Sequence, residues 1–427
     1  MTSDPKAAEE AYVWVWLPGA TDPVVAGLLS RAGDGRLVFN YGRSYLARAD
    51  AIALYDPELP LREGVIAPTE RMALPSCIRD GSPDAWGRRV IINRLMGRKG
   101  GGAGAFDLDE RAYLLESGSD RIGMLDFQRS PTAYVARQRQ SATLEELMAS
   151  ADRVERGVPL TPELDQALQH GTSIGGARPK ALIDAEGRKF IAKFSAGTDL
   201  YSVVKAEFVA MRLARLVGID AAPVRLERAL GKDVLLVERF DRRRVAAGWT
   251  RRGIVSALTL LNLDETEARY ASYEELATQI RHRFAEPAAS LRELFNRLVF
   301  NILCGNTDDH ARNHAAFWDG GTLGLTPAYD LCPQARTGGE ASQAMAIIGD
   351  NRLSRLSVCL EAAAHYHLTP AQARALIAHQ VEIITAHWRP VCDEAGLSEV
   401  DRTLLWGRSF LNPFAFEGFP SDAGAVG

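Results

Sequence analysis

The beginning of the chain alternates between apolar and polar residues. Over residues 11–48, Tyr12, Trp14 and Trp16 fall on one face of this alternation, and glycines separate the runs. A period of two places successive side chains on opposite faces of a strand, and glycine marks the turns between strands. We therefore expect an antiparallel meander of strands in this region.

Helical spacing of apolar residues comes next. Residues 84–95 carry apolar side chains three and four positions apart, and more polar helices are expected over 144–157 and 162–170. The stretch 97–105 is rich in glycine, but no strand precedes it and no Lys-Ser/Thr pair closes it. We interpret it as a connector and not as a phosphate loop.

A strand, a helix and a hairpin then follow one another. Residues 188–194 alternate basic and apolar side chains, and residues 207–216 form an amphipathic pattern. Residues 224–230 are expected to pair with 234–237 across a turn at 231–233. This order is typical of the small lobe of a protein kinase.

Beyond residue 241 the pattern is almost wholly helical. An apolar stripe over 291–302 ends at Gly305, which predicts a buried helix with a glycine C-cap. Further helices are expected over 356–365, 370–387 and 398–406.

Length and charge limit the classes of protein that fit this pattern. With 427 residues the chain exceeds one ordinary hydrophobic core, so two or three packed units are expected. Lys and Arg number 50 against 54 acidic residues, a formal net charge of −4. The chain as a whole therefore has no attraction to DNA or anionic lipid, and a nucleic-acid role would need a local patch or a partner.

Cysteine usage and the first residues bear on the compartment. The five cysteines are odd in number and never form a CxxC pair, which disfavours a disulfide framework and a zinc knuckle. The first residues, MTSDPKAAEEAY, are acidic where a signal peptide needs cations, and no apolar run reaches the roughly 18 residues of a membrane helix. We expect a cytoplasmic protein without a membrane partner.

Three polar residues with a specific spacing follow the predicted glycine cap. Asp308 and Asn313 stand five positions apart in the run CGNTDDHARNHAAF, and Asp330 follows after a turn expected at 319–321, at the end of a strand. Protein-kinase-like enzymes place a base and two magnesium ligands in this order. The pattern predicts that Asp308 orients or accepts a hydroxyl proton while Asn313 and Asp330 hold Mg²⁺.

Other chemistry is compatible with the same run. A solvated loop would explain its polarity, although not the spacing of the three positions. His310 and His314, four apart, would present two imidazoles on one face of a helix, as in a transition-metal hydrolase. No Glu occupies the second position of that pair, so Asp308 and Asp309 would have to complete the site. A metal-dependent phosphohydrolase is kept as an alternative.

Candidate nucleotide contacts precede the helical part. Lys193 lies on a predicted strand and Glu207 on the next helix, an arrangement that holds the α- and β-phosphates in small lobes. The run SIGGARPK, residues 173–180, has two glycines and a basic end, which suits backbone amides near phosphate. Residues 238–241 follow a strand at the expected hinge, where adenine would bond to backbone. Surface charges and ordinary turns are the competing interpretations.

Taken in order, these segments resemble the HipA-type toxin kinases of bacterial toxin–antitoxin modules. The similarity covers most of the chain. It is carried by SPDAWGRRVIINRL and DRIGMLDF in the N-terminal part, SIGGARPKALI as phosphate loop, FIAKF as strand lysine, LLVERFDR as hinge, GNTDDHARNH as catalytic loop and LTPAYDLCP as metal-binding segment. The run ARPK and the acid Asp309 directly after the base depart from the usual pattern.

The resemblance implies an ATP- and Mg²⁺-dependent protein serine/threonine kinase with Asp308 as base and with Lys193, Asn313 and Asp330 in the catalytic set. It implies that Ser173 is autophosphorylated, which would expel the phosphate loop, because a phosphate of about −1.5 to −2 charge competes with those of ATP. The residues implied to contact nucleotide are Gly175, Gly176, Ala177, Arg178, Pro179, Lys180, Lys193, Glu238, Arg239, Phe240, His310, Ala311, Arg312, Asn313, Tyr329 and Asp330, the metal ligands being Asn313 and Asp330.

The resemblance also implies partners. Members of the family act on translation, commonly by phosphorylating an aminoacyl-tRNA synthetase such as the glutamyl enzyme. A small helix-turn-helix (HipB-like) antitoxin that binds operator DNA holds them inactive. The acidic balance of this chain agrees with DNA contact being made mainly by such an antitoxin.

We therefore expect an α+β, protein-kinase-like two-lobed fold. Residues 1–139 would form an N-terminal, mostly β subdomain, residues 140–241 the small lobe with phosphate loop and hinge, and residues 242–427 an all-α catalytic lobe. A catalytically silent pseudokinase that serves as a binding or co-repressor module is kept as a second alternative.

Overall fold

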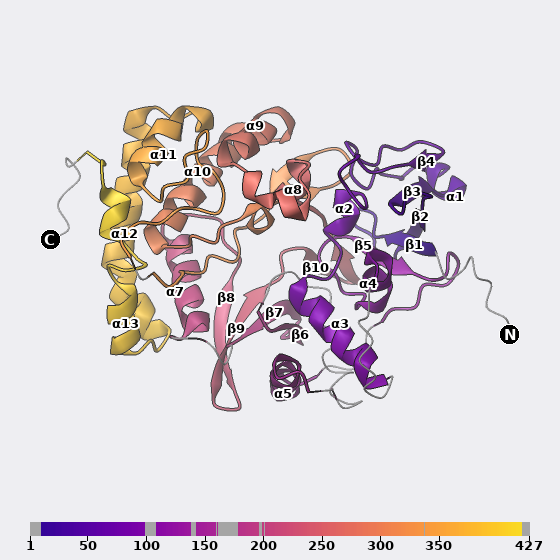
Figure 1. Ribbon diagram of the computed structural model, residues 1–427, viewed down its shortest axis with the longest axis horizontal. Helices are drawn as coiled ribbons and strands as arrows, with labels where there is room; N and C mark the ends of the chain where they lie inside the picture. The colour runs from indigo at the N-terminus through magenta and orange to yellow at the C-terminus, as the bar shows by residue number, and fades with distance from the viewer. Residues whose placement is uncertain are drawn as a thin grey trace. The chain divides into compact units, whose positions relative to one another are not determined.

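The computed structural model describes residues 10–98, 108–137, 142–158, 160, 178–195, 199, 201–336 and 338–420. The chain forms two compact units, which we describe separately (Figure 1). The first comprises Met1–Ala196, Arg228–Val255 and Phe317–Gly321, and the second comprises Gly197–Glu227, Ser256–Ala316 and Thr322–Gly427. The boundaries expected at residues 139 and 241 stay a prediction.

An antiparallel sheet at the beginning of the first unit confirms the expected meander. Its order is β4-β3-β2-β1-β5, with β1 Glu10–Val15, β2 Val24–Arg31, β3 Leu37–Tyr41, β4 Val65–Ile66 and β5 Leu125–Gln128. Trp14 and Trp16 are buried, but Val13 and Val15, which alternate with them, are buried as well. The later half of β1 is therefore covered on both faces, not on one alone.

Two helices of the first unit match the expected positions. α3 (Ala85–Arg98) begins after Asp84, whose carboxylate accepts a hydrogen bond from the Gly87 amide at 2.9 Å. α5 (Leu144–Glu155) begins with a capping box between Thr143 and Glu146. The shorter helices are α1 Arg43–Leu46, α2 Ser76–Arg79 and α4 Glu110–Glu116. The helix expected over 162–170 lies outside the described residues.

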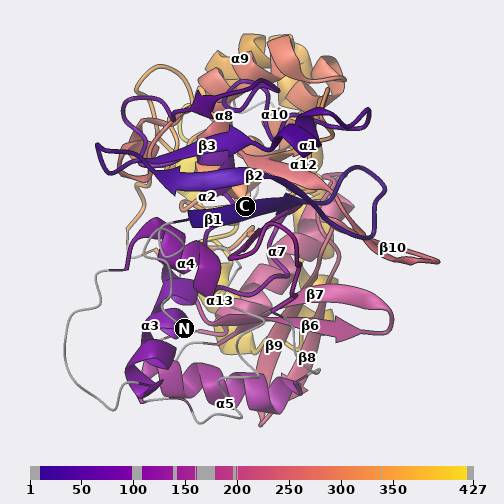
Figure 2. The ribbon, with the colours of Figure 1, turned by 90° about the vertical axis from the view of Figure 1, so that its right-hand side faces the viewer.

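A second sheet carries the core that joins these helices. Its order is β6-β7-β9-β8, with β6 Lys180–Ala185, β7 Arg188–Phe194, β8 Val224–Ala229 and β9 Lys232–Glu238. Phe190, Ala192 and Phe194 of β7 pack with Trp86 of α3 and Leu147 of α5 in one buried cluster. Both helices lie beside this sheet in both views (Figures 1 and 2). The alternation over 188–194 is therefore confirmed, with the apolar face toward the core.

The turn between β8 and β9 differs from the expected one at 231–233. It consists of Leu230 and Gly231, both with positive φ, 49° and 76°. A two-residue hairpin turn of this kind matches the twist of its strands only when both residues are left-handed. A second hairpin follows, with β10 Arg242–Val245 paired to β11 Gly248–Arg251.

The second unit is mainly helical. Its helices are α7 Val203–Leu216, α8 Ala257–Leu260, η3 Glu265–Tyr270, α9 Tyr273–Arg283, α10 Pro287–Cys304, η4 Ala311–Asn313, α11 Leu356–Ala362, η5 Ala363–Tyr366, α12 Pro370–Glu394, α13 Glu399–Leu405 and η6 Pro413–Phe416. α7 begins ahead of the expected residue 207, because Val203 and Val204 extend its buried face. The three later helices expected from the pattern are confirmed.

The central helix of this unit is α10. Its apolar stripe is fully buried, and the helix ends at Gly305, which has φ 71°. A Cβ atom at this position would lie 2.7 Å from the Ser409 carbonyl oxygen. Glycine is therefore required both by the left-handed backbone and by the close approach of Ser409.

The arrangement confirms the expected α+β class, with a strand-rich N-terminal part and a helical C-terminal part. Short strands also occur beyond residue 241, namely β10 and β11 together with β12 Gly253–Ser256, β13 Ala315–Trp318 and β14 Leu323–Leu325. In the part of the chain that the structure describes, no helix combines the length and the apolar character needed to cross a membrane.

Candidate active site

A tight loop after α10 carries the predicted catalytic residues. The Thr307 amide donates to the Gly305 carbonyl at 3.1 Å, and the Thr307 carbonyl accepts from the Ala344 amide at 3.0 Å. The loop then enters η4 (Ala311–Asn313), a short 3-10 helix. Backbone hydrogen bonds therefore hold the chain immediately before Asp308.

Asp308 is exposed and lies among other charged groups. Partial desolvation raises the pKa of its carboxyl, His310 lowers it, and Asp330 and Asp309 raise it further, with a net shift upward. These influences require the carboxyl of Asp330 to be near that of Asp308. The structure thus brings Asp308, His310 and Asp330 into one electrostatic cluster, in which an ionised Asp308 can accept a proton.

Asn313 is buried, and its side chain faces the backbone of Asp308. Its Nδ2 donates to the Asp308 carbonyl at 3.3 Å, and its own backbone amide donates to the His310 carbonyl at 2.8 Å. Because the amide nitrogen points at the loop, the amide oxygen, which is the atom able to ligate a cation, is turned away from that carbonyl. The loop therefore sets the orientation of the amide group.

Asp330 does not lie at a strand end, as the sequence had suggested. β14 ends at Leu325, and Asp330 has a left-handed backbone with φ 60°. Such conformations are costly for non-glycine residues and are concentrated at functional sites. The Asp330 carbonyl accepts from Asn306 Nδ2 at 3.4 Å, and the Tyr329 hydroxyl donates to the Arg312 carbonyl at 2.7 Å. Both contacts connect this segment to the loop after α10.

The donors of this cluster fit a hard divalent cation. Carboxylate and amide oxygens are the ligands that Mg²⁺ prefers, and Asp308, Asp330 and Asn313 supply them. The carboxylates of Asp330 and Asp309 raise the pKa of Asp308, an effect of nearby negative charge that a bound cation would offset. Asn313 and Asp330 stay the predicted ligands.

His310 and His314 do not form a helical metal pair. They flank η4, which is a single turn of 3-10 helix, and His314 is buried with its Nε2 at 2.8 Å from Asp309 Oδ2. Among the described residues, no group of three or more His, Cys, Asp or Glu side chains is arranged to hold a metal ion. This absence does not concern the predicted magnesium ligands, because one of them is the amide of Asn313. These observations count against the transition-metal hydrolase.

Asp309 has a role that the sequence did not reveal. The residue is buried, and its Oδ2 accepts hydrogen bonds from His314 Nε2 and from the Tyr273 hydroxyl. The rings of Tyr273 and His314 meet edge to face at 5.4 Å. Burial and the Asp309 carboxylate raise the pKa of Tyr273 well above its usual range. Asp309 therefore anchors the loop internally, while its neighbour Asp308 faces the charged cluster.

Two predicted phosphate-binding lysines lie opposite each other in the first unit. Lys180 of β6 and Lys193 of β7 are partners in the antiparallel register, on the face away from the core. Lys180 is buried, and its Nζ lies 3.6 Å from Asp84 Oδ2. Like charges directly opposite each other repel, so an anion bound beside them would be stabilising. Glu207 lies in α7 of the second unit, and its pairing with Lys193 stays a prediction.

Most of the expected phosphate loop lies outside the described residues, namely Ser173, Gly175, Gly176 and Ala177. Of the remainder, Arg178 is exposed, and the Pro179 carbonyl accepts from the Phe194 amide at 3.0 Å. Trp86 Nε1 donates to the Lys180 carbonyl at 3.1 Å. The last residues of the loop are therefore anchored to β7 and α3.

The predicted hinge residues have three different environments in the first unit. Glu238 pairs with Arg188 at 2.9 Å, and the Phe240 ring meets Phe317 edge to face at 5.9 Å. The Arg239 side chain is fully buried and pairs with Asp241 at 2.8 Å. Of these residues, Arg239 could meet adenine through its backbone only.

A buried charge network around Asp120 was not predicted. Arg239 and Arg242 lie 3.1 and 2.9 Å from Asp120 Oδ1, and Lys189 lies 3.0 Å from its Oδ2. Burial alone would raise the pKa of Asp120, but Arg239, Arg242 and Lys189 hold it well below its usual range. The motif DRIGMLDF, which begins at Asp120, is thereby connected to the hinge segment of the same unit.

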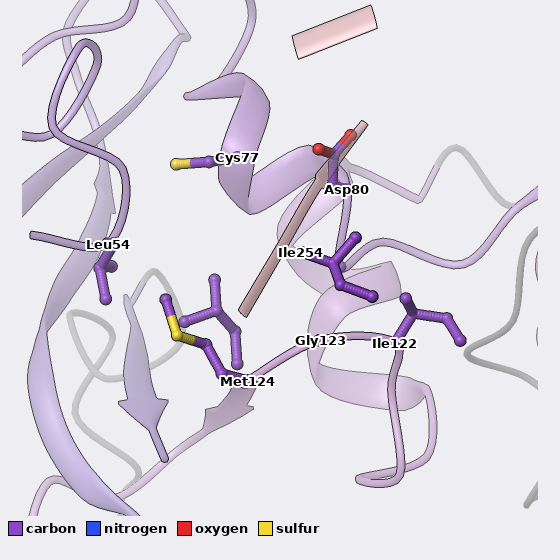
Figure 3. A pocket seen from close by; sticks show the side chains of 9 residues that line it. Leu54, Cys77, Asp80, Ile122, Gly123, Met124 and Ile254 are labelled. Atoms are coloured by element: carbon purple, nitrogen blue, oxygen red, sulfur yellow. The ribbon is translucent and has the colours of Figure 1, made fainter. Parts of the chain in front are cut away.

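A small cavity in the first unit does not coincide with any predicted site residue. It measures about 20 Å³ and is bordered by Leu54, Cys77, Met124 and Ile254 among others (Figure 3). This volume is close to that of a single water molecule. The cavity is therefore a packing feature and too small for a nucleotide.

Family models match both parts of the chain. The HipA N-terminal domain matches residues 15–128, and the HipA-like C-terminal domain matches residues 172–388. Y4mE of Sinorhizobium fredii is 33% identical over 150 residues, which cover 33% of each chain. The serine/threonine-protein kinase toxin HipA of Shewanella oneidensis is 27% identical over 185 residues, which cover 37% of this chain and 42% of that protein. The matched part is thus about a third to two fifths of each relative.

A solved structure shows the same fold over most of the length. In the Shewanella oneidensis complex of HipA, HipB and operator DNA, one chain superposes with a TM-score of 0.68 at 20% identity, covering 94% of this chain and 99% of that one. At this identity the likeness establishes the fold alone. Because the two family domains occur in the family's order and the C-terminal one alone spans about half of the chain, this protein belongs to the HipA family.

Proposed function

We propose that the chain is an ATP- and Mg²⁺-dependent protein serine/threonine kinase. The observation that carries the proposal is the cluster in the second unit, where Asp308 of raised pKa, Asn313 and a left-handed Asp330 gather at the end of α10. The similarity to the Shewanella oneidensis relative, a serine/threonine-protein kinase toxin, supports it. Phosphoryl transfer needs little more from a protein than this set of oxygen groups and correct positioning.

In the proposed reaction, Asp308 accepts the proton of a serine or threonine hydroxyl. That oxygen attacks the γ-phosphorus of ATP, its new P–O bond forms, and the bond to the bridging oxygen breaks to release ADP. Asn313 and Asp330 would hold Mg²⁺, which neutralises charge on the phosphates. Asp309 keeps the loop in place and is not the proposed base, because it is buried and its Oδ2 already accepts from Tyr273 and His314.

The nucleotide side of the reaction is assigned to residues of the first unit. Lys193 and Lys180 would bind phosphate together with the segment 175–179. Backbone groups of residues 238–240 would bind adenine, with Phe240 as apolar cover. The register that places the two lysines opposite each other supports this assignment.

Regulation and partners follow the family resemblance. We propose that autophosphorylation at Ser173 silences the enzyme and that the protein substrate is a component of translation, such as an aminoacyl-tRNA synthetase. The structural neighbour is a complex of HipA with HipB and operator DNA, which supports a HipB-like antitoxin as partner. DNA contact would be made mainly by that antitoxin.

Incorporation of labelled phosphate tests the proposal. The purified chain is incubated with labelled ATP and Mg²⁺, alone and with a cell lysate, and Asp330→Asn is compared with Asp350→Asn. Asp350 is an exposed aspartate of the same unit, so its substitution removes a carboxylate away from the cluster. We expect Asp330→Asn to lose incorporation by roughly a hundredfold or more and Asp350→Asn to retain it.

The outcome also separates the alternatives. No incorporation by the unaltered chain would favour the catalytically silent pseudokinase, as would ATP consumption that is unchanged in Asp308→Ala. Phosphate mapped to a residue other than Ser173 would remove the proposed off-switch while leaving the kinase assignment intact.

A further inference from the structure

A continuous chain of buried polar side chains runs through the second unit. It begins at Asp309, which accepts from the Tyr273 hydroxyl. Asn301 Nδ2 donates to that hydroxyl at 3.4 Å, and Asn306 Nδ2 donates to Asn301 Oδ1 at 2.9 Å. The same Asn306 nitrogen donates to the Asp330 carbonyl at 3.4 Å. The chain therefore ends at the backbone of the left-handed residue.

The hydrogen bonds of this chain diverge from Asn306, whose amide donates in both directions. The two protons of the Asn306 amide serve Asn301 and Asp330, the Asn301 amide serves Tyr273, and the Tyr273 hydroxyl serves an anion. Tyr273, Asn301, Asn306 and Asp309 are each at most 1% exposed. Unpaired polar groups at such depth are costly, and paired ones polarise one another, so a fully paired chain favours a single arrangement.

We propose that Asp309 is a positioning residue that acts through Tyr273, Asn301 and Asn306 to hold the catalytic loop and the backbone of Asp330 in one fixed arrangement. The inference rests on the proposed kinase function and deepens it. Asp308 is the direct neighbour of Asp309, and Asn306 lies two residues before Asp308. The network thus reaches the proposed base at one end and the proposed metal ligand at the other.

The left-handed backbone of Asp330 needs support from the residues around it. A non-glycine residue at φ 60° persists only where its surroundings determine it. The Asn306 side chain donates a hydrogen bond to the Asp330 carbonyl, and Asn301 fixes the orientation of the Asn306 amide. Since phosphoryl transfer depends on the placement of the base relative to the metal ligands, a small shift of either segment would slow the reaction.

Hydrogen exchange distinguishes this role from plain stabilisation of the helices. Tyr273→Phe keeps the ring against His314 but removes the hydroxyl, which leaves the Asn301 amide without its acceptor. Tyr366→Phe is the matched control, because Tyr366 is equally buried in the same unit and its hydroxyl makes no hydrogen bond within the described part of the chain.

In Tyr273→Phe we expect backbone exchange to increase roughly tenfold or more in residues 306–314 and in residues 329–331 together, with α12 unchanged. Tyr366→Phe should alter neither segment. Unchanged exchange at 329–331 in Tyr273→Phe would overturn the proposal, as would equal effects in the two variants. Asp309→Asn, which retains shape but removes the anion, should reproduce the pattern and provides a second variant if Tyr273→Phe folds poorly.

Kinetics supply an independent readout. If the unaltered chain incorporates labelled phosphate, Tyr273→Phe should lower the maximal rate roughly tenfold or more and leave the ATP concentration for half-maximal rate nearly unchanged, because positioning acts on the transition state. A roughly tenfold rise in the ATP concentration for half-maximal rate, with the maximal rate unchanged, would contradict a positioning role. If the unaltered chain incorporates no phosphate, the kinase proposal fails, while the exchange experiment still decides whether Asp309 couples the two segments.

Discussion

Asp308 and Asp309 are neighbours in the chain with opposite surroundings. Asp308 is exposed, and its pKa is raised by partial desolvation and by the carboxylates of Asp330 and Asp309. Asp309 is buried and accepts from two donors, Tyr273 and His314. A carboxylate without dedicated donors is available to a proton, whereas one held by donors serves structure. Asp308 is therefore suited to the proposed proton transfer, and its neighbour Asp309 to holding the loop in place.

This environment predicts how the rate depends on pH. A base must be ionised, so incorporation of phosphate should fall as the pH drops through the pKa of Asp308, which lies above the ordinary value for an aspartate, about 3.9. His310 lowers that pKa. In His310→Gln the pKa of Asp308 should therefore rise, and the acid limb of the rate profile should move to higher pH.

The comparison is made at fixed, saturating ATP and Mg²⁺. His365→Gln is a suitable control, because His365 belongs to the same unit and its Nε2 lies 3.6 Å from Glu274 Oε1 instead of near Asp308. An acid limb that moves to lower pH in His310→Gln, or that moves equally in the control, would contradict the assignment of Asp308 as base.

At the residue scale, sequence spacing predicted a base and two metal ligands but not the residues that position them. Asp308, Asn313 and Asp330 stand in a recognisable order, and the structure gathers them. One partner of Asp309 is Tyr273, which lies 36 residues away, and no local pattern connects them. A weak signal did exist, because Asn301 is a polar residue within the buried stripe of α10, where it needs a partner.

Among the elements, α10 determines where the loop begins. Gly305 ends the helix in a left-handed conformation, and the Asn306 amide then donates to the Asn301 carbonyl at 2.8 Å. The helix cap therefore fixes the point at which the chain leaves the helix and the polar loop begins. A change at the cap should consequently affect stability and loop placement together.

Gly305→Ala tests the cap. The variant adds a left-handed alanine, which costs about 1–2 kcal/mol, and a Cβ that would meet the Ser409 carbonyl oxygen at 2.7 Å. Gly407→Ala is the control, because Gly407 has φ 74° but no neighbouring atom within 4 Å of the point that an alanine Cβ would occupy. We expect Gly305→Ala to lower the free energy of unfolding in denaturant by more than the control. Equal decreases in the free energy of unfolding would show that Ser409 moves away from the new Cβ atom without an energetic penalty.

Elements with strong periodicity were predictable, and their ends were less so. β7 and the stripe of α10 agree with the expected ranges because burial selects one face along the whole element. The Leu230–Gly231 turn was placed too late, since a left-handed leucine is unusual and the sequence favours the later residues. The backbone of Asp330 was read as strand because left-handed aspartate has no hydrophobic signature.

On the scale of the whole chain, the Asp120 network joins segments that are more than a hundred residues apart. Arg242 reaches Asp120 across 122 positions and the Gly123 carbonyl across 119. Both segments belong to the first unit. Composition gave no indication of this network, because charged residues are usually exposed and only the fold makes these ones neighbours.

Asp120→Asn should strongly destabilise the protein. It removes one anion from a buried group of arginines, which leaves Arg239 and Arg242 with less compensation, and breaking such a pair costs about 3–5 kcal/mol. Denaturant unfolding at pH 7 measures the loss. Asp22→Asn, at an exposed aspartate of the same unit, should be nearly neutral.

The pH dependence of that loss has a defined sign. The pKa of Asp120 is depressed in the folded state, so its contribution is complete above the unfolded value of about 3.9 and is lost as the pH falls through the folded value. The stability difference between the unaltered chain and Asp120→Asn should therefore be largest near neutral pH and shrink in acid below about pH 4. A difference that grows in acid would contradict the role of Asp120 as a buried anion.

Net charge leads to a prediction about DNA. With a formal charge of −4, the chain gains little from releasing counterions when it meets a duplex. We expect the isolated chain to leave operator DNA unbound at physiological salt in a gel-shift measurement and to be retained on it when the HipB-like antitoxin is added. Binding by the isolated chain with a steep salt dependence would instead place phosphate contacts on the chain itself. Arg243→Glu, at an exposed position of β10, would then be the first variant to measure.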